Sequence, residues 1–202
     1  STMVENSYDK YGNLIAYKET AADVVMDAEI GYHEKNNQDN YIVSVPQSIK
    51  VMSNGVTYRH RTTEINGKGE ITKITMYNNG DKTSVFDMEY DKYGNVLKSV
   101  KPANYNGDRM FHEYEYDDKY HSLLTSVRDA FGYTSSTTYD ALWLAPDTTI
   151  DLNGARMEYT YDALGRPATI LAPYEIESGQ PFTIKYEYDA ANRLAHTTHY
   201  SQ

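Results

Sequence analysis

The stretch that decides the fold reads Tyr161-Asp162-Ala163-Leu164-Gly165-Arg166-Pro167, and the chain contains close copies of it. Two copies are Tyr8-Asp9-Lys10-Tyr11-Gly12-Asn13-Leu14 and Tyr90-Asp91-Lys92-Tyr93-Gly94-Asn95-Val96. A fourth is Tyr188-Asp189-Ala190-Ala191-Asn192-Arg193-Leu194, in which Asn192 occupies the glycine position. A motif that recurs in this way indicates a repeat protein, in which each unit is one supersecondary element.

Weaker copies set the period of the repeat. They begin at Tyr116-Asp117 and Tyr139-Asp140, so from Tyr90 onward successive copies start 26, 23, 22 and 27 residues apart. Between Tyr8 and Tyr90 the units are degenerate, and examples are Gly67-Lys68-Gly69-Glu70-Ile71 and Asn78-Asn79-Gly80-Asp81.

The Tyr-Asp-x-x-Gly motif is typical of a chain reversal. Asp favours the first position of a type I β-turn, because its carboxylate accepts hydrogen bonds from backbone N–H groups just ahead. Gly three residues later suits a positive φ, and such a turn joins hairpin strands through a G1 bulge. Asn192 fits the same role because Asn tolerates the left-handed conformation. The residues predicted to build these turns are Tyr8, Asp9, Gly12, Tyr90, Asp91, Gly94, Tyr116, Asp117, Tyr139, Asp140, Tyr161, Asp162, Gly165, Tyr188, Asp189 and Asn192.

The segments that flank the motif alternate in polarity as strands do. Met157-Glu158-Tyr159-Thr160-Tyr161, Phe182-Thr183-Ile184-Lys185-Tyr186-Glu187-Tyr188 and Phe86-Asp87-Met88-Glu89-Tyr90 are the clearest cases. A second turn is indicated midway between copies, at Asn153-Gly154 and Phe131-Gly132. Each unit of roughly 22 residues is therefore predicted to be a β-hairpin that leads into the next one, with its apolar face covered by stacked neighbours.

Helix is predicted to be scarce. Only residues 20–29 have helix propensity, and there we favour an extended structure over a short helix. Residues 101–108 and 172–175 are interpreted as longer loops. At ~8 residues per strand the chain holds ~16 strands. Because open sheets of more than ~10 strands rarely stay flat, we expect an all-β sheet that is curved and strongly twisted, a wall around a space.

Composition narrows the function. The 202 residues include 21 Tyr against 4 Phe and 1 Trp, which favours half-buried sheet surfaces over one deep core. The net charge of −10 argues against nucleic-acid binding, which needs a basic surface to neutralise phosphates. The most basic stretch, Arg59-His60-Arg61, is too short to provide one. There is no Cys and no apolar run of ~18 residues, so disulfides and membrane insertion by this segment are not expected. No signal peptide is recognisable.

Candidate chemical sites are weak. His196 and His199 would lie on opposite faces of a strand, which does not suit a shared metal. The oxygen-rich runs Asp117-Asp118 and Asn36-Asn37-Gln38-Asp39-Asn40 lack a calcium-loop pattern, and Glu113 with Glu115 is more typical of a wet strand face than of a glycosidase pair. We therefore predict no catalytic residue, metal or cofactor.

Tyrosine pairs leave one alternative open. Tyr114 with Tyr116, Tyr159 with Tyr161, and Tyr186 with Tyr188 form aromatic rows. Such rows could stack on sugar rings, but cross-strand packing gives the same pattern without a ligand.

The tandem Tyr-Asp-x-x-Gly-[Asn/Arg]-[Leu/Val] motif resembles the YD, or rearrangement hot spot (Rhs), repeat, best over residues 153–167. Tyr41-Ile42-Val43-Ser44-Val45-Pro46 with Arg59-His60-Arg61 is similar to repeats of bacterial toxin-complex B and C components. This resemblance implies a single repeat segment over 1–202, cut from a larger secreted or cell-surface protein. It implies a non-enzymatic wall of a hollow β-shell that contacts neighbouring repeats and encloses a toxin or effector; the alternative is an adhesin-like surface for a glycan or receptor.

Overall fold

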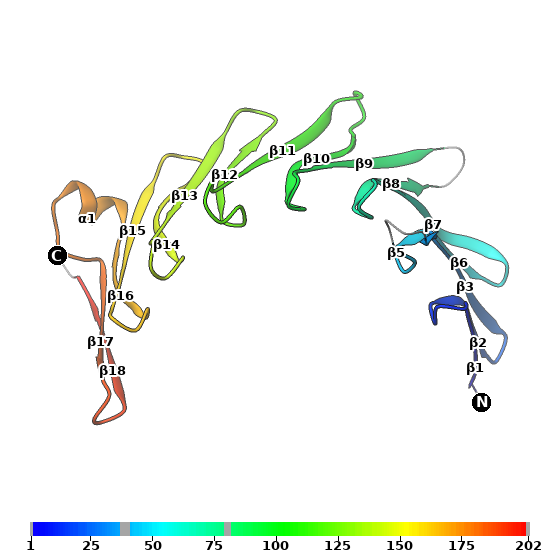
Figure 1. Ribbon diagram of the computed structural model, residues 1–202, viewed down its shortest axis with the longest axis horizontal. Coiled ribbons are helices and arrows are strands. Elements are labelled where there is room, and N and C mark those ends of the chain that lie inside the picture. Colours follow the sequence, from blue (N-terminus) through cyan, green and yellow to red (C-terminus); the bar gives the residue numbers. More distant parts are fainter. Residues whose placement is uncertain (1, 37–40, 79–81, 201–202) are drawn as a thin grey trace. The chain divides into compact units, whose positions relative to one another are not determined.

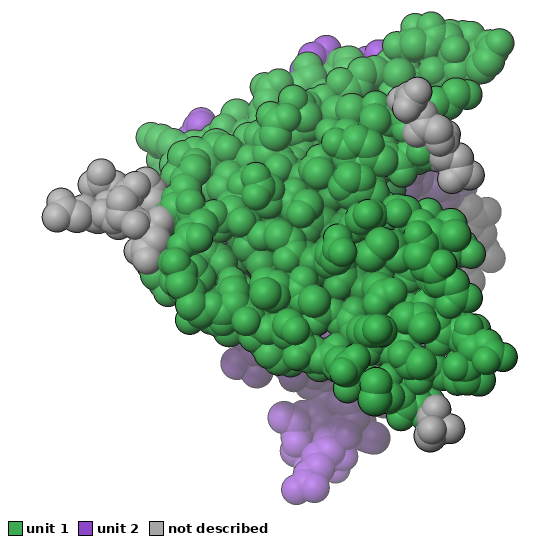
Figure 2. Space-filling view, turned by 90° about the vertical axis from the view of Figure 1, so that its right-hand side faces the viewer, with its two compact units in different colours: residues 1–111 green, residues 112–202 purple. Residues whose placement is uncertain are grey.

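The computed structural model describes residues 2–36, 41–78 and 82–200, and within them the chain is almost entirely β-structure (Figure 1). The runs Asn37–Asn40 and Asn79–Asp81, which carry parts of two sequence interpretations, lie outside the described residues. Two compact units are formed, residues 1–111 and 112–202, coloured separately in Figure 2.

Each unit is built from antiparallel strands that follow one another in sequence order. Apart from the small pair β4–β5, all described strands belong to one 16-stranded sheet. The strands of the first unit are β1 (Thr2–Tyr8), β2 (Leu14–Ala21), β3 (Val24–Tyr32), β4 (Lys35–Asn36), β5 (Tyr41–Ile42), β6 (Pro46–Ser53), β7 (Val56–Ile65), β8 (Ile71–Tyr77), β9 (Thr83–Tyr90) and β10 (Val96–Ala103). Strand β11 (Arg109–Tyr116) contains the boundary, and the second unit continues with β12 (Leu124–Asp129), β13 (Thr134–Tyr139), β14 (Pro146–Ile150), β15 (Arg156–Tyr161), β16 (Pro167–Leu171), β17 (Ile184–Asp189) and β18 (Leu194–His199). The predicted all-β fold of tandem hairpins is confirmed.

Register shifts lie beside the motif tyrosines. They fall between Ser7 and Tyr8, between Thr138 and Tyr139, and between Thr160 and Tyr161. The opposite ends of the same strands join without a shift in the pairs β2–β3, β12–β13 and β14–β15. The extra residue is the bulge that a type I turn followed by a left-handed residue requires, so in these hairpins the edge that carries the motif differs in backbone geometry from the opposite edge.

Residues 20–29 are extended, as predicted: β2 ends at Ala21 and β3 begins at Val24. Two loop predictions were wrong. In the segment 101–108, β10 runs to Ala103 and the remainder is a tight turn, because Asn104 N donates to Asp108 O over 2.8 Å and Gly107 N donates to Asn104 O over 3.1 Å.

The second wrong loop prediction concerns residues 172–175, which enter helix α1 (Pro173–Glu177; Figure 1). Proline opens this helix, where its missing N–H costs nothing, and Glu175 in the first turn accepts a 2.6 Å hydrogen bond from the Thr183 hydroxyl. The chain after the helix is irregular up to Ile184, so β17 starts two residues later than the alternation beginning at Phe182 predicted.

A deep core is lacking among the described residues. Val43 is the one buried hydrophobic side chain there, and strand residues on both faces are mostly half-buried. A single layer of sheet leaves both faces accessible, so cross-strand packing and hydrogen bonding must supply much of the stability.

Candidate functional site: the tyrosine–aspartate turns

Asp162 shows how the motif closes a turn. Its Oδ1 accepts hydrogen bonds from the backbone N–H of Leu164 at 2.8 Å and of Arg166 at 3.0 Å. Its Oδ2 receives the Arg166 side chain, through Nε at 2.7 Å and Nη2 at 2.6 Å. Asp162 N donates to Arg166 O over 2.9 Å, and Gly165 supplies the left-handed residue with φ +76°. The carboxylate therefore provides the acceptor for the backbone N–H groups of Leu164 and Arg166 in the turn.

The same arrangement recurs along the described chain. An Asx side-chain Oδ1 accepts the N–H groups two and four residues ahead, and a glycine with positive φ stands three residues ahead. The turns begin at Asp9, Asn66, Asp91, Asn104, Asp129, Asp151 and Asp162. The turns predicted at Asn153-Gly154 and Phe131-Gly132 are confirmed, and the degenerate unit at Gly67–Ile71 also contains such a turn.

Sequence reasoning missed the residues that open four of these turns, Asn66, Asn104, Asp129 and Asp151. The signal missed is Asx-x-x-Gly without a preceding Tyr.

In five of these turns the first residue also forms a side-chain hydrogen bond with the residue four ahead. Where the first residue is Asp, as in Asp91, the residue four ahead can donate: Asn95 Nδ2 reaches Asp91 Oδ2 at 2.8 Å. Where the first residue is Asn66, the residue four ahead is an acid, and Asn66 Nδ2 donates to Glu70 Oε2 at 2.5 Å. The first residue and the residue four ahead exchange the roles of donor and acceptor between these two turns, so each turn has one side-chain hydrogen bond between these positions.

Three motif copies lack glycine and form wider loops. Asp117 N donates to Leu123 O over 3.0 Å, and Asp140 N donates to Ala145 O over 2.9 Å. These acceptors lie six and five residues ahead, whereas in the glycine turns the acceptor lies four residues ahead. The left-handed residues in these loops are His121, with φ +55°, and Leu144, with φ +53°.

The third loop, at Asp189, corrects the role predicted for Asn192. The residue with positive φ is Arg193, at +57°, whereas Asn192 donates its backbone N–H and its side-chain amide to the Asp189 carboxylate. Strands β17 and β18 pair from Asp189–Leu194 onward without a register shift, so four residues form the loop and the left-handed position falls on the last of them.

Four motif tyrosines and one further tyrosine each tie a hairpin to the one before it. Tyr161, at the end of β15, donates its hydroxyl to Pro146 O, the first residue of β14, at 2.6 Å. The acceptor directly follows the Asp140 loop, the turn of the preceding copy. The same hydrogen bond is made by Tyr32 to Leu14 O, Tyr90 to Ile71 O, Tyr139 to Leu124 O and Tyr188 to Pro167 O, at 3.1, 2.8, 2.7 and 2.9 Å. We call these five residues the latch tyrosines.

Tyr32 was missed by sequence reasoning because no Asp follows it; the available signal was its place 24 residues after Tyr8. Tyr8 itself ends β1 and is 59% exposed. Tyr116 ends β11 opposite Leu124, beside a register shift.

Side chains also stack from turn to turn. The Trp143 ring covers Gly165 so closely that a Cβ there would lie 2.6 Å from Trp143 Cε3. The Arg166 guanidinium lies 3.9 Å from the centre of the Tyr188 ring, and Asn13 Nδ2 donates to Val43 O over 2.7 Å. The Asp162 and Asp9 turns thus contact the chain of a neighbouring repeat as well as their own residues.

The turn aspartates are stabilised as anions. Partial desolvation alone would raise the pKa of Asp117, but the N–H groups of Lys119, Tyr120, Ser122 and Leu123 all donate to its carboxylate and lower its pKa to about 2. The Arg166 side chain lowers the pKa of Asp162. These carboxylates are filled by protein donors, which leaves little of their coordinating capacity for a metal ion.

The other candidate residues do not assemble into a reactive centre. Glu113 forms an ion pair with Arg128 across β11 and β12. His196 and His199 both lie in β18, and no group of three metal-ligating side chains occurs in the described ranges.

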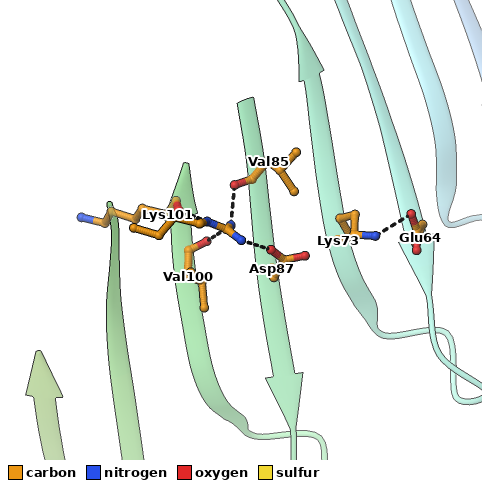
Figure 3. A network of polar contacts seen from close by, with 7 residues as sticks. Glu64, Lys73, Val85, Asp87, Val100 and Lys101 are labelled. Carbon is orange, nitrogen blue, oxygen red and sulfur yellow. Dashed lines mark hydrogen bonds and ion pairs between the residues drawn. The ribbon is translucent and has the colours of Figure 1, made fainter. Parts of the chain in front are cut away.

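Figure 3 shows a similar structural use of polar groups in the first unit, where Lys73 Nζ contacts Glu64 at 2.9 Å. Nearby, Arg109 joins two strands: it pairs with Asp87 of β9 at 2.7 Å and donates to Val85 O at 2.8 Å and to Lys101 O of β10 at 2.9 Å.

Comparison with known proteins places the fold. No protein-family model and no curated protein matches the chain. The crystal structure of a TcdB2–TccC3–Cdc42 complex matches 97% of it with a TM-score of 0.61 at 13% identity. The chain has the fold of a segment of a Tc toxin complex. The Photorhabdus luminescens Tc holotoxin pore also matches 97% of this chain, with a TM-score of 0.62 at 13% identity.

The matched region is 14% of the TcdB2–TccC3–Cdc42 chain and 13% of the holotoxin chain, so this sequence spans about a seventh of those proteins. At this identity the likeness is one of fold, and it agrees with the YD repeat inferred from the motif. Within the described residues no helix is long and apolar enough to span a membrane.

Proposed function

We propose that this chain is a non-enzymatic structural segment of a secreted, Rhs-type toxin shell, whose sheet forms part of the wall that encloses an effector. The observation that carries the proposal is the chemical use of the motif. Its tyrosine joins consecutive hairpins, its aspartate fills the turn, and its glycine or a replacement provides the left-handed residue. All of these roles are structural, as expected for a repeat whose function is to build a wall.

The shared fold with Tc toxin complexes supports the same proposal. The single-layered sheet supports it as well, because a wall needs two accessible faces and no deep core. No nucleophile with an adjacent base is formed by the motif residues, so we propose that the segment itself performs no catalysis.

Protease protection in the intact natural gene product tests enclosure. If the segment belongs to a closed wall, peptides from enclosed sequence appear only at urea concentrations that unfold the sheet. Asp162→Ala, which weakens a turn, then shifts their release to lower urea, whereas Asp118→Ala, an exposed neighbour of Asp117, does not. Digestion of all sequence outside the repeats in native buffer would overturn the proposal, as would a gene product that consists of these repeats alone.

A further inference from the structure

Two arginines on β7 differ from most other arginines of the chain in their lack of an ion pair. Four of the remaining five form ion pairs, namely Arg109, Arg128, Arg156 and Arg166. Arg59 and Arg61 have no carboxylate partner among the described residues, although the chain carries 29 acidic side chains against 19 Lys and Arg. Both are exposed. An unpaired arginine pair in an acidic protein is a feature that the fold does not explain.

The two guanidiniums share one face with apolar side chains. Arg59 pairs in register with Val51, and Arg61 with Ile49 on one side and Met76 on the other. Residues directly opposite in an antiparallel pair point to the same face. The Arg59 and Arg61 side chains are therefore set on an apolar strip of β6, β7 and β8, while Lys50 points to the other face.

A trough follows this strip within the first unit. One concavity of ≈ 500 Å³ is lined by Ile49, Val51, Met76, Arg59 and Arg61, together with Tyr58, His60, Tyr77 and Asn78. A second, of ≈ 440 Å³, shares Val51, Tyr58 and Arg59 with it and extends to Met26. A third shares Ile49 and Arg61 and extends the other way, to Pro46 and Ile71. The three together run along β6 and β7 with the arginines in the middle.

We propose that this trough, the Arg59–Arg61 trough, binds an extended acidic segment of another polypeptide, in which two carboxylates two residues apart meet Arg59 and Arg61. Residues i and i+2 of a strand lie about 7 Å apart on one face, so the two arginines have the spacing of alternate side chains in an extended peptide. Each guanidinium can take a carboxylate through two parallel hydrogen bonds.

The walls of the trough select the rest of the ligand. Ile49, Val51 and Met76 offer apolar contacts, so aliphatic side chains beside the two acids complete the fit. The same walls and the net charge of −10 disfavour a nucleic acid, which is a polyanion with few apolar groups outside its bases. This proposal stands apart from the shell function, because the trough is lined by none of the turn aspartates, turn glycines or latch tyrosines.

Binding of a labelled synthetic peptide to the purified 202-residue chain tests the proposal. The probe is Leu-Glu-Val-Glu-Leu with blocked ends, followed by fluorescence anisotropy up to about 1 mM protein. We expect saturable binding, weakened about tenfold when both Glu are replaced by Gln, since two exposed ion pairs are worth about that much together. Binding should also weaken as salt is added.

Arg59→Gln with Arg61→Gln should produce the same loss, and Lys50→Gln, which removes one charge from the opposite face, should leave binding within about twofold. The Gln peptide keeps the test valid even if the arginine variants fold poorly. Equal binding of the Glu and Gln peptides, tighter binding of a single-stranded oligonucleotide than of the peptide, or no saturable binding would overturn the proposal. So would a dimer in sedimentation that dissociates on the two arginine substitutions, because the trough would then be filled by a second copy.

Discussion

Turns that contain glycine and turns that lack it solve the same problem in different ways. The Asp162 turn closes on the fourth residue, with Gly165 left-handed. The Asp117 loop is two residues longer and places His121 in the left-handed region, yet its carboxylate accepts four backbone N–H groups where Asp162 accepts two. The comparison teaches that the carboxylate defines the turn, while glycine shortens it and relieves backbone strain.

Acid should affect both kinds of turn, and we expect the largest effect from it. The pKa values of Asp9, Asp91, Asp117, Asp162 and Asp189 are all lowered in the folded chain, that of Asp117 to about 2. An unfolded Asp titrates near ~3.9, so these groups contribute their full stabilisation above about pH 4 and lose it as the pH falls toward about 2.

Urea midpoints measured from pH 7 to pH 2 check this expectation. The midpoint should be level down to about pH 5 with respect to these groups and should fall steeply below about pH 4. A midpoint that stays level to the lowest pH would show that the carboxylates do not hold the turns.

Asp117→Ala is the next largest change, because it leaves four backbone N–H groups without their acceptor. Thermal melting should shift down by several degrees, and Asp117→Asn should fall between the variant and the parent, since Asn66 shows that an amide oxygen can accept the same kind of bond. Asp118→Ala is the matched control and should melt with the parent. Equal melting of the two alanine variants would remove the special role of Asp117.

Gly165→Val and Gly107→Val separate strain from crowding. Both glycines have positive φ, +76° and +90°, so each valine should cost about 1–3 kcal/mol. Only at Gly165 would the new Cβ meet a neighbour, Trp143, so that variant should lose roughly 1 kcal/mol more. In a Trp143→Ala background the difference should vanish. A persistent difference measured by urea unfolding would mean that the two turns are not equivalent.

Arg193→Gly should have the smallest effect and the opposite sign. A left-handed non-glycine residue costs about 1–2 kcal/mol, and glycine gives back about 0.5–1 kcal/mol in unfolded-state entropy. We therefore expect a gain of roughly 0.5 kcal/mol in the free energy of unfolding, and none for Asn192→Gly. An increase in the free energy of unfolding for Asn192→Gly alone would show that Asn192, and not Arg193, is the left-handed residue.

Much of this architecture could be predicted because its causes are local. The alternation before Tyr90 and Tyr161 and the Asp-x-x-Gly spacing each act within one hairpin, so strands and motif turns follow from short stretches. Helix α1 did not follow, since five residues opened by Pro173 carry almost no periodicity. The Asn104 turn was interpreted as part of a longer loop over 101–108, although Asn104 stands where the motif has Asp and its amide oxygen accepts the same hydrogen bonds.

The latch itself lay beyond sequence reasoning. A tyrosine at the end of a strand predicts a half-buried ring, but nothing local says that the hydroxyl of Tyr161 reaches Pro146 O, fifteen residues earlier on the neighbouring strand. That acceptor is set by the register of β14 against β15, in which Thr148 pairs with Glu158. The Arg59–Arg61 trough could not be predicted either, because the residues that line it come from three strands.

Replacing all five latch tyrosines by Phe tests the central claim most directly. Tyr32 and Tyr90 lie in the first unit and Tyr139, Tyr161 and Tyr188 in the second, so at about 1 kcal/mol per hydroxyl the units should lose about 2 and 3 kcal/mol of unfolding free energy in urea. The control replaces five exposed tyrosines for which the described structure records no hydroxyl bond, Tyr8, Tyr58, Tyr105, Tyr133 and Tyr174, and should unfold with the parent. Unchanged stability of the latch variant, together with loss of binding on a glycan array, would contradict a structural role and return the tyrosines to ligand recognition.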